Sequence, residues 1–77
     1  MNERIVSDPE IMLGKPVVRG TRITVESIVE RLGAGETVEA IVDAHPRLLR
    51  EDVFAAIAFA AEALKSVGAY PISTGAA

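Results

Sequence analysis

The segment 14–23, Gly-Lys-Pro-Val-Val-Arg-Gly-Thr-Arg-Ile, constrains the fold more than any other part of the chain. Its two glycines allow positive φ, and its proline fixes φ and lacks an N–H donor, so an ordinary helix cannot run through it. The pattern predicts a tight β-hairpin. Residues 17–18 and 22–23 would form two short extended arms, with the reversal at Gly20.

Three cations project from this segment, at Lys15, Arg19 and Arg22. No acid separates them, so together they predict a local anion-binding surface that suits the phosphates of a nucleic acid. Two other interpretations stay open. The segment can be an ordinary solvated hairpin, or its arginines can pair with Asp8, Glu26 or Glu30 and fasten the hairpin to the helix that follows.

A helical region follows the hairpin. Thr24 and Thr37 are good N-cap residues, and each has a glutamate two positions later, where it suits the first turn of a helix. We expect a first helix that ends at Gly33 and a second of about two turns that ends before Pro46. The third and longest helix is expected over residues 50–67.

Apolar residues recur along these helices at helical spacing. In the third helix the predicted inward stripe is Val53, Ile57, Ala61 and Leu64. The residues expected to converge in the core are Ile28, Leu32, Ile41, Ile57 and Leu64. On this interpretation Ile57→Ala removes a large core side chain and costs about 2–5 kcal/mol of stability.

Length and composition limit the remaining possibilities. Seventy-seven residues allow one domain, expected over residues 1–67, with a small aliphatic core that dimerisation would support. The chain has no cysteine and a single histidine, His45, so we expect no disulfide, no metal site and no cofactor. It has no secretion signal at its start and no apolar run near the roughly 18 residues of a membrane span, which predicts a cytoplasmic protein.

Both ends of the chain are candidates for association. Residues 4–6 have the apolar content of a short strand, and an exposed strand edge pairs readily with another chain, so a homodimer is expected. Residues 68–77 lack helical periodicity and are expected to form a tail. Within it, Tyr70, Pro71 and Ile72 are the residues most able to dock on a partner, for example by adding a strand.

The charge is divided unevenly along the sequence. The whole chain has a net charge of −3. Residues 1–25 hold four cations and three acids, whereas residues 26–77 hold four cations and eight acids. Any nucleic-acid surface must therefore be local, and the acidic helical part suits a basic partner such as a ribonuclease.

An ordered set of residues spans the N-terminal part of the chain: Asp8-Pro9, Ile11, Gly14-Lys15-Pro16 and Gly20-Thr21-Arg22-Ile23. In this set, and in the spacing Gly-Lys-Pro-x-x-x-Gly-Thr-Arg, the chain resembles a widespread family of small bacterial proteins from about Ile5 to about Glu62. The family is catalogued as domain of unknown function four-three-three and is grouped with helix-turn-helix antitoxins. The resemblance implies a compact trihelical fold of DNA-binding type, often encoded beside a PIN-like ribonuclease toxin that it is proposed to neutralise.

One position departs from the family. Members of the family carry threonine where this chain has Leu49, and that threonine would form a capping pair with Asp52. Leucine cannot accept the hydrogen bond, so the start of the third helix is expected to be shifted or frayed. At the same helix start, Arg47 and Arg50 are candidate nucleic-acid contacts, although neighbouring acids repel phosphate.

The sequence therefore predicts a mostly α-helical protein, in which an N-terminal short strand and β-hairpin precede a three-helix bundle of helix-turn-helix type. The predicted function is an antitoxin-like DNA-binding regulator of a type II toxin–antitoxin system, with a PIN-like toxin and operator DNA as partners. A protein-binding module without DNA binding is the alternative. No nucleophile lies beside a base in the sequence, so catalysis is not expected.

Overall fold

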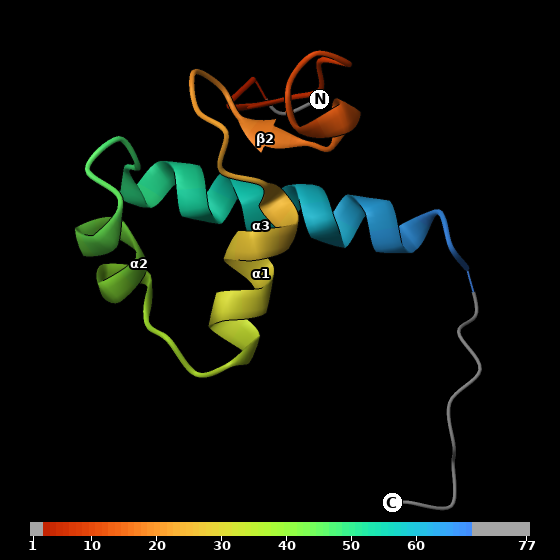
Figure 1. Ribbon diagram of the computed structural model, residues 1–77. Coiled ribbons are helices and arrows are strands. Elements are labelled where there is room, and N and C mark those ends of the chain that lie inside the picture. Colours follow the sequence, from red (N-terminus) through yellow and green to blue (C-terminus); the bar gives the residue numbers. More distant parts are fainter. Residues whose placement is uncertain (1–2, 69–77) are drawn as a thin grey trace, which may run out of the picture.

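The computed structural model describes residues 3–68, in which a small β-ribbon packs on three helices (Figure 1). The elements are β1 (Ile5–Val6), the 3-10 helix η1 (Met12–Gly14), β2 (Val17–Val18), α1 (Val25–Gly33), α2 (Val38–Ala44) and α3 (Arg50–Lys65). β1 pairs antiparallel with β2, with Ile5 opposite Val18 and Val6 opposite Val17. The predicted fold class is confirmed. The expected docking residues Tyr70, Pro71 and Ile72 lie outside the described residues.

The predicted reversal at Gly20 is present, but its second arm is shorter than expected. Gly20 has a φ of 80°. The Val18 N–H donates to the Ile23 carbonyl at 2.9 Å, and Val17 forms an isolated bridge with Thr24. Thr24 is already the N-cap of α1, so the chain turns into the helix before a second strand can form, and the longer pairing of β2 is with β1.

The turn before this segment, at η1, has an unusual backbone conformation. Met12 and Leu13 have φ values of 50° and 60°, a left-handed conformation that bulky residues rarely adopt. Hydrogen bonds from the Gly14 N–H to the Ile11 carbonyl and from the Ser7 hydroxyl to the Gly14 carbonyl, at 3.1 and 2.6 Å, hold the turn. Leu13 is consequently 93% exposed and is not a core residue.

Both predicted threonine caps are confirmed. The Thr24 hydroxyl accepts from the Ser27 N–H, and the Thr37 hydroxyl accepts from the Ala40 N–H, each at 3.0 Å. At the start of α3, Leu49 offers no side-chain cap. Its own N–H instead donates to the Asp52 carboxylate at 2.9 Å, so α3 starts at Arg50 without a side-chain cap from Leu49.

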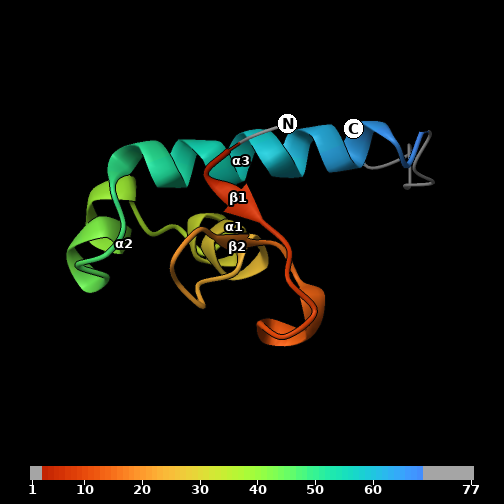
Figure 2. The same cartoon turned by 90° about the horizontal axis from the view of Figure 1, so that it is seen from above.

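The core lies between the ribbon and the helices. Its buried apolar residues are Ile5, Val17, Val18, Val25, Ile28, Ile41, Leu48, Val53 and Ala56. Figure 2 shows β1, β2, α1 and α2 on one side of α3, so within residues 3–68 these elements cover one face of this helix. No helix within residues 3–68 is long and apolar enough to cross a membrane.

The predicted core stripe of α3 is wrong in register. Ile57 is 39% exposed and Leu64 is 65% exposed, whereas Val53 and Ala56 are completely buried. Successive residues of an α-helix are about 100° apart around its axis, so Ile57 lies about 100° from Ala56 and about 40° from Val53, at the edge of the inner face. Phe59 and Ala60 continue the inner face and are partly buried.

A polar contact fastens the N-terminal strand to α3. An Arg4 Nη1 donates to the Asp52 Oδ1 at 2.9 Å, and Asp52 is 6% exposed. The other carboxylate oxygen of Asp52 accepts from Leu49, so this single acid both caps α3 and holds the end of β1 against it.

Candidate nucleic-acid interface

Two of the five predicted nucleic-acid cations have partners near the ribbon. Lys15 Nζ lies 2.9 Å from Glu26 Oε1 of α1, and both side chains are more than half exposed. Arg19 Nε donates to the Glu3 carbonyl at 2.9 Å. Lys15 thus fastens the hairpin to α1, whereas Arg19 bonds a backbone carbonyl and not one of the acids that the sequence alternative proposed for the arginines.

Arg50 also has partners. Its guanidinium pairs with the Glu39 carboxylate of α2 and lies 5.3 Å from the centre of the Phe54 ring, one turn further along α3. A cation at this distance from an aromatic face is attracted to it. Arg50 therefore connects α2 to the exposed side of α3.

The remaining two predicted cations, Arg22 and Arg47, line one hollow. Its volume is about 540 Å³, and its walls are formed by Ile11, Gly20, Thr21, Arg22, Ile23 and Arg47. Within residues 3–68, neither arginine side chain has an ion pair or hydrogen bond, so the predicted alternative of an internal partner for Arg22 does not hold there. The fold brings together two arginines that are far apart in the sequence.

Short-range contacts position these two arginines. The Thr21 hydroxyl donates to the Val18 carbonyl at 2.8 Å and accepts from the Ile23 N–H at 3.0 Å, which fixes the turn that presents Arg22. The Thr21 hydroxyl makes both hydrogen bonds within this turn, so its donor is not available to a bound anion. On the other wall, the next residue after Arg47 is the buried Leu48, which anchors the α2–α3 connection.

The walls of this hollow hold two positive charges and no acid. Arginine stays charged at all ordinary pH values and presents planar donors that match phosphate oxygens. Both side chains are exposed, so an anion can reach them without displacing a protein partner. This arrangement can bind a phosphate group or the backbone of a nucleic acid.

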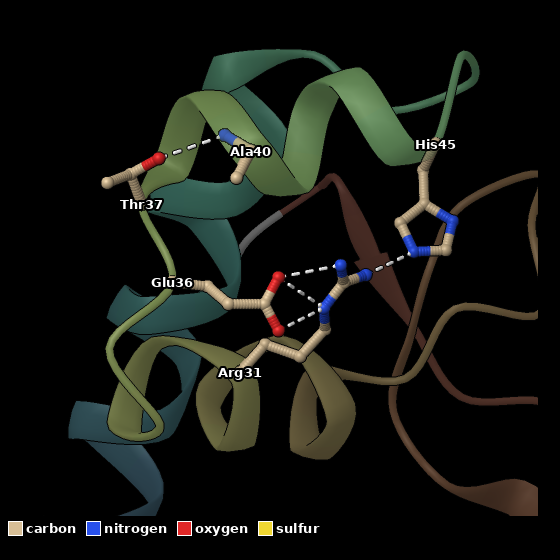
Figure 3. Close-up of polar contacts among 5 residues, drawn as sticks. All are labelled: Arg31, Glu36, Thr37, Ala40 and His45. Atoms are coloured by element: carbon tan, nitrogen blue, oxygen red, sulfur yellow. Dashed lines mark hydrogen bonds and ion pairs between the residues drawn. The ribbon is translucent and has the colours of Figure 1, made fainter.

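A second polar cluster joins α1 to α2 (Figure 3). Arg31 donates to both carboxylate oxygens of Glu36, with distances of 2.7–3.1 Å, and its Nη1 lies 2.7 Å from His45 Nε2. Because arginine can only donate, His45 accepts through Nε2 in this contact. The hydrogen bond from Arg31 lowers the pKa of Glu36.

This cluster has a structural role. It connects the last turn of α1, the α1–α2 connection and the residue that ends α2. His45 is thus held by Arg31, which differs from the carbonyl-capping role that its sequence position suggests. Among the described residues, no three histidine or acidic side chains are grouped so that they could hold a metal ion.

Sequence reasoning missed one surface, which we call the outer face of α3. Its large apolar residues are Phe54, Ile57 and Leu64, with exposed fractions of 48%, 39% and 65%. The sequence did contain a signal, because these residues and Ala61 follow a regular spacing. The predicted core stripe combines Ile57, Ala61 and Leu64 with Val53, whereas the exposed row combines them with Phe54.

Comparisons with known proteins agree with the resemblance seen in the sequence. Residues 5–60 match the family described as Protein of unknown function (DUF433). A protein of Sinorhizobium fredii, described as uncharacterized protein y4eO, is 41% identical over 51 residues. The aligned part covers 66% of this chain and 23% of that protein, so this chain spans only about a quarter of the relative. No solved structure matches the chain. The family match covers more than half of the sequence, and the chain belongs to the family of unknown function DUF433.

Proposed function

We propose that this protein is a DNA-binding regulator of antitoxin type, which acts in the cytoplasm as a homodimer and neutralises a PIN-like ribonuclease toxin. The observation that carries the DNA-binding part is the hollow that Arg22 and Arg47 share. Two arginines from separate segments converge there without an acidic neighbour in its walls. Arg22 and Arg47 have no side-chain partner within residues 3–68, whereas Lys15, Arg19 and Arg50 would each have to give up a contact to bind an external anion.

The position of this hollow supports a nucleic acid as the anion. Arg47 lies in the connection that leads into α3, the longest helix, and the order of α2, connection and α3 is that of a helix-turn-helix unit. In such units the connection and the start of the second helix approach the duplex. Phosphate contacts from this region orient a protein on DNA without reading its sequence.

The toxin-binding part of the proposal rests on the family resemblance and on charge. Residues 26–77 hold twice as many acids as cations, which suits the basic surface of a ribonuclease. A protein-binding module without DNA binding is the second candidate. It is favoured by a separate observation, the exposed apolar residues on the outer face of α3.

The DNA-binding part can be tested with the double variant Arg22→Ala/Arg47→Ala. Binding to the DNA upstream of the gene should weaken for all sequences alike. The slope of log affinity against log salt concentration should fall by roughly two units, because each lost phosphate contact releases about one fewer counterion. Fluorescence anisotropy over a salt series measures both quantities.

Lys15→Ala is the matched control, because this cation is paired with Glu26. We expect it to change the salt slope by less than half of the change that the loss of one phosphate contact causes. Thermal unfolding should show that the double variant is folded, since neither arginine side chain makes an ion pair or hydrogen bond with the rest of residues 3–68. An unchanged salt slope in the folded double variant would remove this hollow as the DNA site. Coexpression with the product of the adjacent gene tests toxin neutralisation separately.

A further inference from the structure

The outer face of α3 is an apolar surface that the fold leaves uncovered. Within residues 3–68, the β-ribbon, α1 and α2 pack on the side of this helix that carries Val53 and Ala56 (Figure 2). Phe54, Ile57 and Leu64 are each at least 39% exposed, and their spacing places them in one row along the edge of the covered side, where Leu64 also borders a hollow shared with Val29 of α1. An aligned row of large apolar side chains on one helix is a typical mark of an association surface.

The spacing of this row is that of a coiled-coil seam. Phe54, Ile57, Ala61 and Leu64 stand at intervals of three, four and three residues, which are the a and d positions of two heptads. Small side chains occupy the middle of the face, at Ala58 and Ala61, and both are exposed. A second helix can approach closely at these alanines, with larger residues packed toward each end.

Charges at the two ends of the face select the orientation of that second helix. Glu51 and Lys65 are two heptads apart and share one edge of the face, the e positions that flank the seam. In an antiparallel pair, e positions face e positions, so Glu51 of each copy meets Lys65 of the other. A parallel pair would lose both of these contacts.

The two charged residues are available for this contact. Glu51 has no ion pair or side-chain hydrogen bond within residues 3–68. Among residues 3–68, the one ion pair of Lys65 is an i,i+3 contact with Glu62, in which both side chains are about three-quarters exposed. Exposed pairs of this kind contribute little, so Lys65 can exchange its partner at small cost.

We infer that the outer face of α3 binds the same face of a second copy of this chain, with the two helices antiparallel. Phe54 of one copy lies opposite Leu64 of the other, Ile57 lies opposite Ala61, and the two-fold axis passes beside Ala58. Such an interface is isologous and closes at two subunits. This inference names the contact surface of the proposed homodimer and holds whether or not the dimer binds DNA.

Sedimentation equilibrium of the full chain, from micromolar concentrations up to about 1 mM, tests the inference. The wild type should be a dimer in this range. Ile57→Asp should raise the dissociation constant by at least about a hundredfold, because it buries an unpaired carboxylate in the seam. Met12→Asp is the matched control: Met12 is 41% exposed, as Ile57 is 39% exposed, but lies away from α3. It should leave the dimer intact.

A charge exchange tests the antiparallel orientation. Glu51→Lys and Lys65→Glu should each weaken the dimer by roughly two- to tenfold, because each replaces two attractive contacts by two repulsive ones. The double variant should recover the wild-type dissociation constant. Circular dichroism checks that every variant remains folded. Failure of the double variant to recover would reject the antiparallel arrangement.

Three results would overturn the inference. A wild type that stays monomeric up to about 1 mM would reject self-association. A folded Ile57→Asp variant that dimerises like the wild type would move the interface elsewhere, for example to the edge of β1. A monomeric wild type that binds the adjacent gene product through Ile57 would assign the face to a different protein. The Arg22→Ala/Arg47→Ala variant should remain dimeric, so a failure of DNA binding and a failure of dimerisation can be told apart.

Discussion

The two faces of α3 have similar apolar content and opposite environments. Val53 and Ala56 on the inner face are fully buried, while Phe54 and Ile57, their immediate neighbours in sequence, are about half and two-fifths exposed. Large apolar residues of the helix therefore occur on both sides, since Phe59 packs against the core whereas Phe54, Ile57 and Leu64 are exposed. Size and hydrophobicity alone do not identify the core side of a helix in which apolar residues occur all around the axis.

Polar contacts distinguish the two faces. At the inner face, Asp52 is buried and bonded to Arg4 and to the Leu49 backbone, so the helix is fixed with this side inward. At the outer face, the charged residues that flank the apolar row are exposed. The inner face stabilises the fold, and the outer face is available for association.

The largest difference in stability loss is expected between one substitution in the core at the inner face of α3 and one on its outer face. Ile41 of α2 is fully buried in the cluster that covers the inner face, so Ile41→Ala should cost about 2–5 kcal/mol. Ile57→Ala should cost less than about 1 kcal/mol, because its side chain is already partly hydrated. Urea denaturation at low protein concentration, where dimerisation does not contribute, measures both. A greater loss for Ile57→Ala would reverse the assignment of the faces.

An intermediate effect is expected from adjacent acids at the start of α3. Asp52→Ala removes a cap and the contact with Arg4 and should cost about 1–3 kcal/mol. The loss should stay below that of a fully buried ion pair, because Arg4 is 44% exposed and remains hydrated. Glu51→Ala is the matched control, with an expected change within about 0.5 kcal/mol. Thermal and chemical unfolding should agree on this order, and equal losses would show that the buried contacts of Asp52 contribute nothing.

The sequence predicted the local structure well. Threonine caps at Thr24 and Thr37, the glycine reversal at Gly20 and the three helices follow from residue chemistry within a few positions, and all are present. The register of α3 depends on contacts distant in sequence. Residues 53, 57, 61 and 64 and residues 53, 56 and 60 both fit a helical period, and only the packing of β1, α1 and α2 decides between them.

The candidate site was predicted only in part, because it also depends on contacts between residues that are distant in sequence. The sequence identified the cations Arg22 and Arg47 but did not distinguish them from Lys15, Arg19 and Arg50, which were predicted as nucleic-acid contacts equally. Whether a cation has an internal partner depends on which acid or carbonyl the fold brings within reach. Glu3, Glu26 and Glu39 are brought within reach of three of the cations, and the hollow contains the other two.

The smallest effect is expected from the contact between Glu39 of α2 and Arg50 of α3. The pKa of Glu39 is lowered, first by a hydrogen bond to its own backbone N–H and then by Arg50, which also lies over Phe54. A carboxylate with a lowered pKa stabilises the folded state above the pKa of about 4.3 of an unfolded glutamate. This contribution is lost as the pH falls through the lower pKa of the folded state.

Melting temperatures measured from neutral pH down into the acid range should therefore decline less steeply in Glu39→Gln than in the wild type. Arg50→Ala should flatten the decline by a smaller amount, because the hydrogen bond to the Glu39 backbone remains and still lowers the pKa of that carboxyl group. Glu30→Gln, an exposed substitution on α1, is the control and should leave the slope unchanged. If Glu39→Gln and Glu30→Gln have the same pH dependence, the contact between Glu39 and Arg50 is not maintained in solution. Arg50 would then be a third cation free to bind phosphate beside Arg22 and Arg47.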